Sequence, residues 1–273
     1  MTADPGRSPS PELFDGYQRP TMDVRPRSLF DVYRPEPPPW RWYDLVGVLV
    51  GGLILSFAVS VPLALVTLAL ADNPAAASLD PNSPILFAGG AILQTLSFLV
   101  VTWVVLRGRQ APLLASLGFD RLGRWPLWLV LVVAVGVALL SDLLSLLAHQ
   151  PLQPPEFAAI YADRRGWPLL LVGVGLVGPL GEEILFRGLL YRTLASRFGV
   201  WTAIALVVVF FTVIHVTTYG ANAWALIQVG IGAIALTLVR AWTGSLVPST
   251  AMHATLNVYS TLQGMLFTAL GWW

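Results

Sequence analysis

Residues 167–195 read WPLLLVGVGLVGPLGEEILFRGLLYRTLA, and this stretch decides the class of fold. As an α-helix, which rises about 1.5 Å per residue, it is long enough to cross a hydrocarbon core of about 30 Å. It nevertheless holds two adjacent carboxylates, Glu182 and Glu183, and a cation, Arg187, among apolar residues. An ionisable side chain at membrane depth costs roughly 2.5–3.5 kcal/mol or more, so such groups usually mark functional sites. The stretch therefore predicts a membrane helix that carries the functional site.

Six further apolar runs flank this stretch, and each is long enough to cross a membrane. Together they give seven predicted spans: 44–70, 85–106, 126–147, 167–195, 200–218, 222–241 and 245–270. Most of the 11 Trp residues fall near the ends of these runs, as in the aromatic belts of membrane proteins. Composition agrees, because 56% of the 273 residues are hydrophobic, 11% are charged and the mean hydropathy is +0.70. We expect an all-α fold, a polytopic transmembrane helix bundle of about seven spans.

Residues 1–42 differ from the rest because they are rich in Pro and charge and contain no long apolar run. We expect them to form a disordered N-terminal tail, followed by a transmembrane helical domain at 43–273. The tail lacks the apolar region and cleavage site of a secretory signal, so we expect it to be retained. An approximate LFDxY..RP pair at 13–20 and 29–35 either docks a protein partner twice or is a coincidence of biased composition.

All 16 basic residues are Arg, and their distribution predicts the orientation in the membrane. Nearly all lie in the tail or in and beside the connections at 107–125, 192–199 and 241–244, whereas two lie in the 148–166 connection. By the positive-inside rule, the N-terminus is then cytoplasmic and the C-terminus external. The Arg-only basic content and the short loops favour an integral protein of a bacterial plasma membrane.

Charge and Cys content exclude several classes of function. The 16 basic and 15 acidic residues leave a net charge of +1, which offers no surplus for binding nucleic acid. With no Cys, the chain has no disulfide, no thiolate nucleophile and no thiolate-bound metal. Catalysis would have to use carboxylate, imidazole or hydroxyl groups.

Three predicted spans carry the candidate site residues, which are Glu182, Glu183, Arg187, Phe211, His215, His253 and Asn257. Glu183 and Arg187 are four residues apart with the acid first, the favoured order for an ion pair on one helix face. This pair neutralises one carboxylate and leaves Glu182, about 100° further around the helix, directed elsewhere. The Gly residues before the pair allow a neighbouring helix to approach closely, or the helix to kink.

The depth of these residues along their helices predicts which of them meet. Glu182 and His215 each lie roughly 25 Å from the turn that joins their spans, so they can face each other. His253 lies only about 14 Å beyond the start of its span. To bring His253 to the same depth as Glu182, that span must be tilted or must start deeper in the membrane, around Pro248. For Asp142, near the external end of its span, we expect a structural or interfacial role.

A carboxylate, two imidazoles and an amide suit the activation of water, because Glu182 can take its proton while His or Asn stabilises the oxyanion. Glu182, His215 and His253 could instead hold a divalent metal such as zinc, with water in the open position. The sequence leaves both alternatives open, with zinc as the cofactor in one and no cofactor in the other. Other hydrolase patterns, H-E-x-x-H, paired intramembrane Asp residues and G-x-S-x-G, are missing, and Ser245 at a span end is interpreted as a cap or turn residue.

The order Glu182-Glu183-x-x-x-Arg187, Phe211-x-x-x-His215 and His253-x-x-x-Asn257 resembles the CAAX protease and bacteriocin-processing family, the Rce1-like or Abi intramembrane proteases, over about 167–260. The resemblance implies an intramembrane endopeptidase in which Glu182 activates water. It implies that His215, His253 and Asn257 complete the site and that Glu183 and Arg187 support it. Members are described both as metalloproteases and as metal-independent glutamate proteases. The implied substrate is a membrane peptide or protein, and prenylated C-a-a-X proteins are not expected in a bacterium.

Two other functions compete with this hypothesis. A non-catalytic scaffold or immunity-type protein would recruit a partner through the tail and keep the polar residues for packing. A proton-coupled transporter would use Glu182 and the histidines as a relay, but the two halves of the chain show no inverted repeat.

Overall fold

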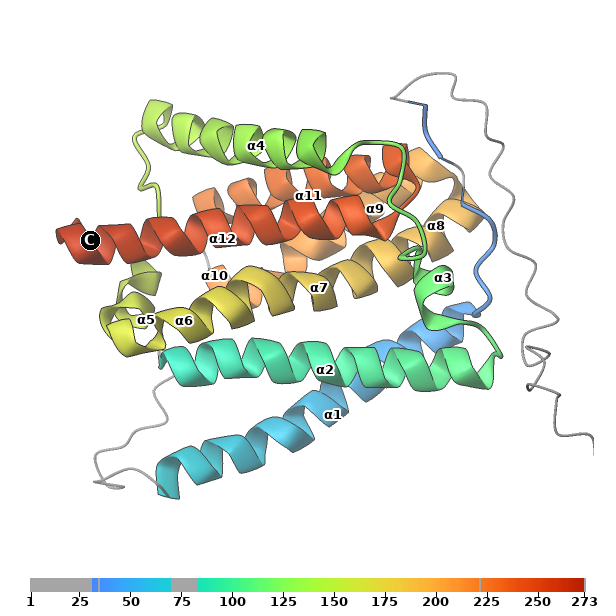
Figure 1. The fold of residues 1–273 in the computed structure, drawn as a ribbon, viewed down its shortest axis with the longest axis horizontal. Coiled ribbons are helices and arrows are strands. Elements are labelled where there is room, and N and C mark those ends of the chain that lie inside the picture. The colour runs from blue at the N-terminus through green and yellow to red at the C-terminus, as the bar shows by residue number, and fades with distance from the viewer. Residues whose placement is uncertain (1–30, 34, 70–82, 221, 273) are drawn as a thin grey trace, which may run out of the picture.

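The computed structural model describes residues 31–33, 35–69, 83–220 and 222–272. Within these residues the chain forms helices and connections, without a strand (Figure 1). The α-helices are α1 (Trp42–Ala69), α2 (Pro84–Gly108), α3 (Leu113–Leu117), α4 (Leu127–Leu147), α5 (Ala158–Ala162), α6 (Trp167–Leu170), α7 (Gly178–Glu183), α8 (Tyr191–Phe198), α9 (Val200–Ile214), α10 (Val216–Tyr219), α11 (Ala223–Thr243) and α12 (Leu246–Leu270). Two 3₁₀ turns, η2 (Pro155–Phe157) and η3 (Arg164–Gly166), and two π-helical segments, η4 (Leu171–Val177) and η5 (Ile184–Leu190), complete the order.

The predicted fold class is confirmed, and the seven predicted spans coincide with α1, α2, α4, the run α6 to α8, the run α9 to α10, α11 and α12. Six segments of the described chain are long and apolar enough to cross a membrane: Trp42–Val66, Pro84–Gly108, Leu127–Leu147, Arg164–Phe198, Val200–Tyr219 and Ala223–Thr243. The seventh predicted span, α12, has 25 residues but does not belong to this set. Its polar residues explain the difference, because several of them line the interior of the bundle (Ser249, His253, Asn257, Ser260 and Gln263).

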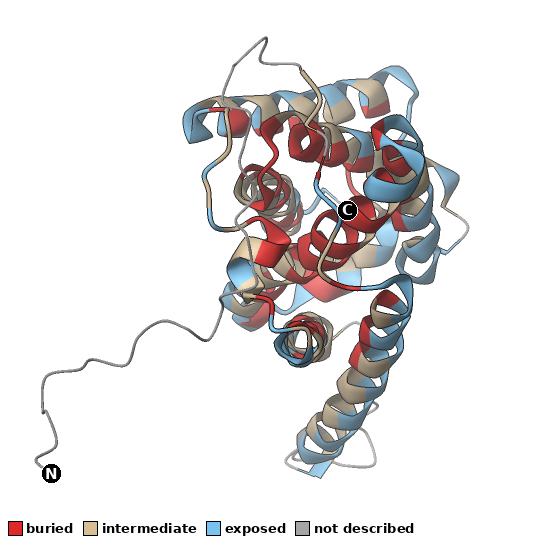
Figure 2. Cartoon of the chain, turned by 90° about the vertical axis from the view of Figure 1, so that its right-hand side faces the viewer, coloured by how far each residue is buried: buried red, intermediate tan, exposed pale blue. Residues whose placement is uncertain are grey.

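The helices form a bundle in which α12 lies between α4 and α11 on one side and the run α6 to α8 on the other (Figure 1). Helix α2 packs along that run, and α1 packs on α2 at the periphery. Buried residues concentrate in the centre of the bundle, while large apolar side chains such as Phe57 and Ile54 of α1 are exposed (Figure 2). Outward apolar faces are expected where the surrounding solvent is lipid.

Residues 31–33 and 35–41 lie against the end of the bundle formed by α8 and α11 (Figure 1). The backbone N–H of Tyr33 donates to a carbonyl of α11 at 2.8 Å. The indole N–H of Trp40, a residue that is only 5% exposed, donates to Thr193 of α8 at 2.9 Å. This stretch is therefore held on the bundle by hydrogen bonds and by burial of Trp40.

Part of the segment predicted as a disordered tail, residues 31–33 and 35–41, thus lies against the bundle. Buried Trp40, and Val32 packed on the core, offset the entropy of ordering this part, and Arg192 donates to the carbonyl of Glu36 at 3.3 Å. Residues 1–30 and Arg34, with the first LFDxY..RP copy and part of the second, lie outside the described residues.

The start of helix α12 is covered by protein. Ser245 caps the helix as predicted, because its hydroxyl oxygen accepts from the N–H of Val247 at 3.2 Å. Ser245 is 0% exposed, and its hydroxyl lies 3.2 Å from the carbonyl of Gly118, in the turn that follows α3. The structure brings His253 Nε2 within 3.6 Å of Glu182 Oε2, with α12 beginning at Leu246.

Candidate functional site

The helix that carries the two glutamates is interrupted on both sides, because η4 and η5 flank the six-residue α7. A π-helical turn shifts the hydrogen-bond pattern and is frequent at functional sites. Two carbonyls of η4 accept from outside the helix: Val177 from the hydroxyl of Thr95 at 3.1 Å, and Val174 from the amide of Asn257 at 3.0 Å. The irregular backbone is thus tolerated at membrane depth because neighbouring side chains supply donors.

Glycines allow α2 to approach this run, as the sequence predicted. A Cβ added to Gly173 would lie 2.6 Å from the backbone oxygen of Ala88. A Cβ added to Gly181 would lie 2.5 Å from the hydroxyl oxygen of Thr95. No side chain fits at either position, so the two glycines set the distance between α2 and the site.

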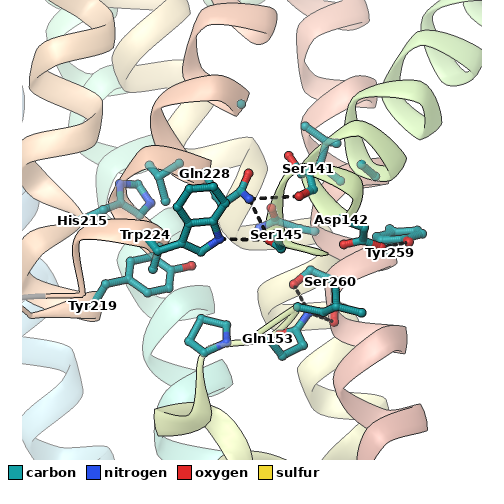
Figure 3. A pocket seen from close by; sticks show the side chains of 18 of the residues that line it. Ser141, Asp142, Ser145, Gln153, His215, Tyr219, Trp224, Gln228, Tyr259 and Ser260 are labelled. Atoms are coloured by element: carbon teal, nitrogen blue, oxygen red, sulfur yellow. Dashed lines mark hydrogen bonds between the residues drawn. The ribbon is translucent and has the colours of Figure 1, made fainter. Parts of the chain in front are cut away.

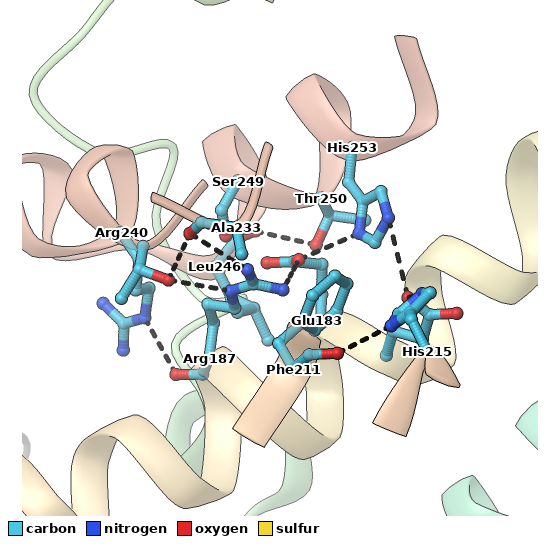
Figure 4. Close-up of polar contacts among 12 residues, drawn as sticks. Glu183, Arg187, Phe211, His215, Ala233, Arg240, Leu246, Ser249, Thr250 and His253 are labelled. Atoms are coloured by element: carbon cyan, nitrogen blue, oxygen red, sulfur yellow. Dashed lines mark hydrogen bonds and ion pairs between the residues drawn. The ribbon is translucent and has the colours of Figure 1, made fainter. Parts of the chain in front are cut away.

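Glu183 and Arg187 form the predicted ion pair, with Arg187 Nη1 2.8 Å from Glu183 Oε1 and both side chains 0% exposed (Figure 4). Arg187 also donates to the hydroxyl of Thr237 and the carbonyl of Ala233, each at 3.3 Å. Its guanidinium lies over the ring of Phe211, 4.4 Å from the centroid. The buried cation is therefore paired and hydrogen-bonded, as a charge in the bundle interior must be.

The two histidines are held by their Nδ1 atoms (Figure 4). His215 Nδ1 lies 2.7 Å from the carbonyl oxygen of Phe211, and His253 Nδ1 lies 3.0 Å from Glu183 Oε1. Both partners are acceptors, so each Nδ1 carries a proton that it donates. In the neutral form, each Nε2 then has a free lone pair.

Both Nε2 atoms face the same carboxylate oxygen. Glu182 Oε2 lies 3.6 Å from His253 Nε2 and 4.0 Å from His215 Nε2. The Glu182 side chain is 37% exposed, whereas that of Glu183 is fully buried. The adjacent glutamates are thus separated into one accessible carboxylate and one buried in an ion pair, as the 100° rotation between them predicts.

Phe211 and Asn257 complete the predicted set. The Phe211 ring packs edge-on against Phe186, with centroids 4.9 Å apart, and contacts the rings of both histidines at 4.5 and 5.8 Å. Asn257 uses one amide N–H for the Val174 carbonyl and lies on the cavity walls beside Glu182. The structure therefore brings together all seven residues named from the sequence.

Two cavities meet at this site. The first, called here the α4 cavity, has a volume of about 260 Å³ and is lined by α4, α11, α12 and residues 150–154 (Figure 3). The second, called the α2 cavity, has about 530 Å³ and is lined by α2, α5, η4 and α12. Both are lined by Glu182, His215, Tyr219, Asn257 and Ser260. The accessible carboxylate is therefore reached from two directions.

The 148–166 connection supplies part of the walls of both cavities. Gln153 lines the α4 cavity, and Phe157 and Tyr161 line the α2 cavity. Burial raises the pKa of the Tyr161 phenol above its usual value, and a hydrogen bond with Thr261 opposes that rise. Tyr161 thus stays neutral at physiological pH.

Sequence reasoning missed Tyr219 and the Gln residues of the α4 cavity. The ring of Tyr219 stacks near that of His215, with centroids 6.2 Å apart and planes 19° apart. A Tyr near a span end is typical of the membrane interface, so the sequence offered no signal for this role. Gln153 and Gln228 are uncharged and therefore did not stand out by desolvation cost.

The donor atoms at Glu182 suit zinc in kind, but their placement does not fit a metal ion. Two donors around tetrahedral zinc lie about 3.3 Å apart, given bonds of about 2.0–2.1 Å. The Nε2 atoms of His253 and His215 lie 3.6 and 4.0 Å from Glu182 Oε2. Across the described chain, no group of three or more His, Cys, Asp or Glu side chains is arranged to hold a metal ion.

Fold and site together define an integral membrane protein with a carboxylate and two imidazoles inside its helix bundle. Residues 164–259 match the family model of the type II CAAX prenyl endopeptidase Rce1-like proteins. The matched range contains all seven candidate residues. This match bears out the resemblance to the CAAX protease family that the sequence indicated for this part of the chain. Comparisons with curated proteins and with solved structures found no match.

Proposed function

We propose that this protein is an intramembrane endopeptidase that hydrolyses a peptide bond of a membrane-associated protein or peptide with water activated by Glu182. The observation that carries this proposal is the position of Glu182 Oε2, which faces two imidazole Nε2 atoms where two cavities meet. The match of residues 164–259 to the Rce1-like family model supports a protease acting on a membrane substrate.

Glu182 acts as the general base in this proposal. Its carboxylate takes a proton from a water molecule as the water oxygen attacks the scissile carbonyl carbon. The same proton then passes to the leaving nitrogen, so that the carboxylate is regenerated when the C–N bond breaks. Exposure of 37% leaves this carboxylate accessible to water and substrate.

The oxyanion that forms needs N–H donors close by. His253 and His215 supply an Nε2–H when protonated, and Asn257 has a second amide N–H beyond the one that Val174 accepts. The fixed Nδ1 hydrogen bonds hold both rings with Nε2 toward Glu182. These donors would stabilise the negative charge without moving during the reaction.

Glu183 and Arg187 are positioning residues. Glu183 Oε1 accepts from His253 and from Arg187, so it orients the imidazole while the guanidinium neutralises its charge. The Arg187 guanidinium in turn packs on the ring of Phe211. The backbone carbonyl of Phe211 orients His215. One ion pair therefore stabilises the positions of both imidazoles.

The test is cleavage of a panel of membrane peptides by purified full-length protein in detergent. Glu182→Gln preserves the shape of the side chain but removes the base, so we expect cleavage to fall at least about 100-fold. Glu36→Gln, the same change at an exposed site at the other end of the bundle, serves as the matched control and should cleave normally.

A chelator arm separates the two forms of water activation. With the side chains alone acting, cleavage by wild type continues after treatment with the chelator, whereas its loss and recovery with zinc would assign the water to a metal. Cleavage that survives Glu182→Gln would overturn the proposed role of Glu182. Failure of folded wild type to cut any peptide would favour the non-catalytic scaffold.

A further inference from the structure

The α4 cavity contains polar groups that the proposed reaction does not use (Figure 3). Gln153, only 5% exposed, donates from Nε2 to the carbonyl of Ser260 at 3.2 Å and to Gln263 Oε1 at 2.7 Å. Because two acceptors face Nε2, the orientation of the amide is settled. Its Oε1 is buried and has no hydrogen-bond partner in the described chain.

Gln228 repeats this pattern on the α11 side of the cavity. Its Nε2 donates to the carbonyl of Ser141 at 3.0 Å and to the hydroxyl of Ser145 at 2.9 Å (Figure 3). Its Oε1 is also buried without a partner among the described residues. Both amides beside the cavity therefore use their donors on protein atoms, and their oxygens are fully buried without a donor.

Asp142 adds a negative charge to the same wall. Its Oδ2 accepts from the hydroxyl of Tyr259 and from Gln263 Nε2, the latter at 2.9 Å. No Arg lines the cavity, and no ion pair to Asp142 occurs in the part of the chain that the structure describes. A carboxylate within a membrane span is costly unless a cation compensates it.

The Asp142 carboxylate on the cavity wall is complementary to a ligand that carries a positive charge and N–H donors. A Lys ammonium has three donors and no acceptor, and an Arg guanidinium has five. We propose that the α4 cavity binds a Lys or Arg side chain of the substrate, with Asp142 as counter-ion. This inference rests on the proposed function and names its substrate as a membrane peptide with a basic residue near the scissile bond.

If Asp142 has only a structural role, loss of its hydrogen bonds should affect the protein more than loss of its charge. The hydrogen bonds from Tyr259 and Gln263 tether α4 to α12, and Asp142→Asn keeps an acceptor for them while removing the charge. Tyr259→Phe does the reverse, because it removes one tether and keeps the charge. Charge binding is therefore lost in the first variant, whereas tethering is weakened in the second.

The experiment measures peptide binding by full-length protein in nanodiscs, in the Glu182→Gln background so that no peptide is cut. The probes are apolar dodecapeptides with an uncharged dye, each with one Lys at a successive position, and a matched set with norleucine instead. At one position we expect Lys to lower Kd about tenfold or more relative to norleucine. Asp142→Asn should abolish this ratio and Tyr259→Phe should keep it. Asp120→Asn, which removes an equal charge at the far end of the bundle, should keep it too.

Binding separates this inference from the proposed function. A Lys preference that Asp142→Asn abolishes supports the basic-residue site even if wild type cuts none of the peptides. A preference that persists in Asp142→Asn, or its absence at every position, overturns the site, and cleavage by wild type would then still support the protease.

Discussion

At the scale of single residues, the site depends on a charge pair with no access to solvent. Glu183 and Arg187 are both 0% exposed, so removing either charge leaves the other buried and uncompensated. We expect Glu183→Gln and Arg187→Met each to lower the free energy of unfolding by about 3 kcal/mol or more. The double variant should lose little more than one single variant, because the unpaired charge is gone.

The measurement is a double-mutant cycle of unfolding in detergent, followed by Trp fluorescence. Asp120→Asn, which removes a carboxylate that is 38% exposed, is the control and should change stability little. Losses that simply add in the double variant would contradict a coupled pair.

At the scale of helices, the distance between α2 and η4 sets the position of the site. The Cβ of a Gly173→Ala variant would meet backbone atoms of Ala88 at 2.6 and 3.0 Å, and backbone cannot turn away as a side chain can. Displacement of η4 would move the Val174 carbonyl and, with it, Asn257. We expect about a tenfold loss of kcat and a stability loss of about 1–3 kcal/mol.

Gly136→Ala in α4 is the matched control for this change. A Cβ at Gly136 has no atom within 4 Å, and Ala is the better helix former, so activity and stability should be kept. The pair of variants is compared by peptide cleavage and thermal unfolding. Equal behaviour of both would show that the close approach of α2 is dispensable.

At the scale of the whole molecule, both cavities are lined by residues of the 148–166 connection, at the end of the bundle opposite docked residues 31–33 and 35–41 (Figure 1). From the distribution of Arg residues, we propose that this end is external and that the N-terminal end is cytoplasmic. The chain has no Cys, so single introduced cysteines report position without background. With a membrane-impermeant maleimide on intact cells, we expect Ala159→Cys to be labelled and Ser196→Cys to be protected until the cells are opened.

Both test positions are exposed, and both changes are small. Labelling of both positions in opened cells controls for reactivity. The reverse pattern in intact cells would invert the proposed orientation and place access to the site on the cytoplasmic side.

Much of the fold and of the site was predictable because the signals are local. The length of an apolar run decides whether it can span a membrane, and the cost of burying Glu182, Glu183 and Arg187 marks them wherever the helix lies. The four-residue spacing of Glu183 and Arg187 sets their pairing within one helix, whatever surrounds it. These properties belong to short segments and do not require knowledge of their neighbours.

Only the tertiary structure decided which groups meet across helices. The meeting of His253 with Glu182 depends on how α12 packs against α7, and the tautomers of both histidines depend on acceptors from other residues. Residues 31–33 and 35–41 are ordered because the bundle offers partners to Trp40 and to the backbone of Tyr33, although their composition resembles that of a free tail. Partners across helices are fixed by packing, which no local pattern of one chain segment encodes.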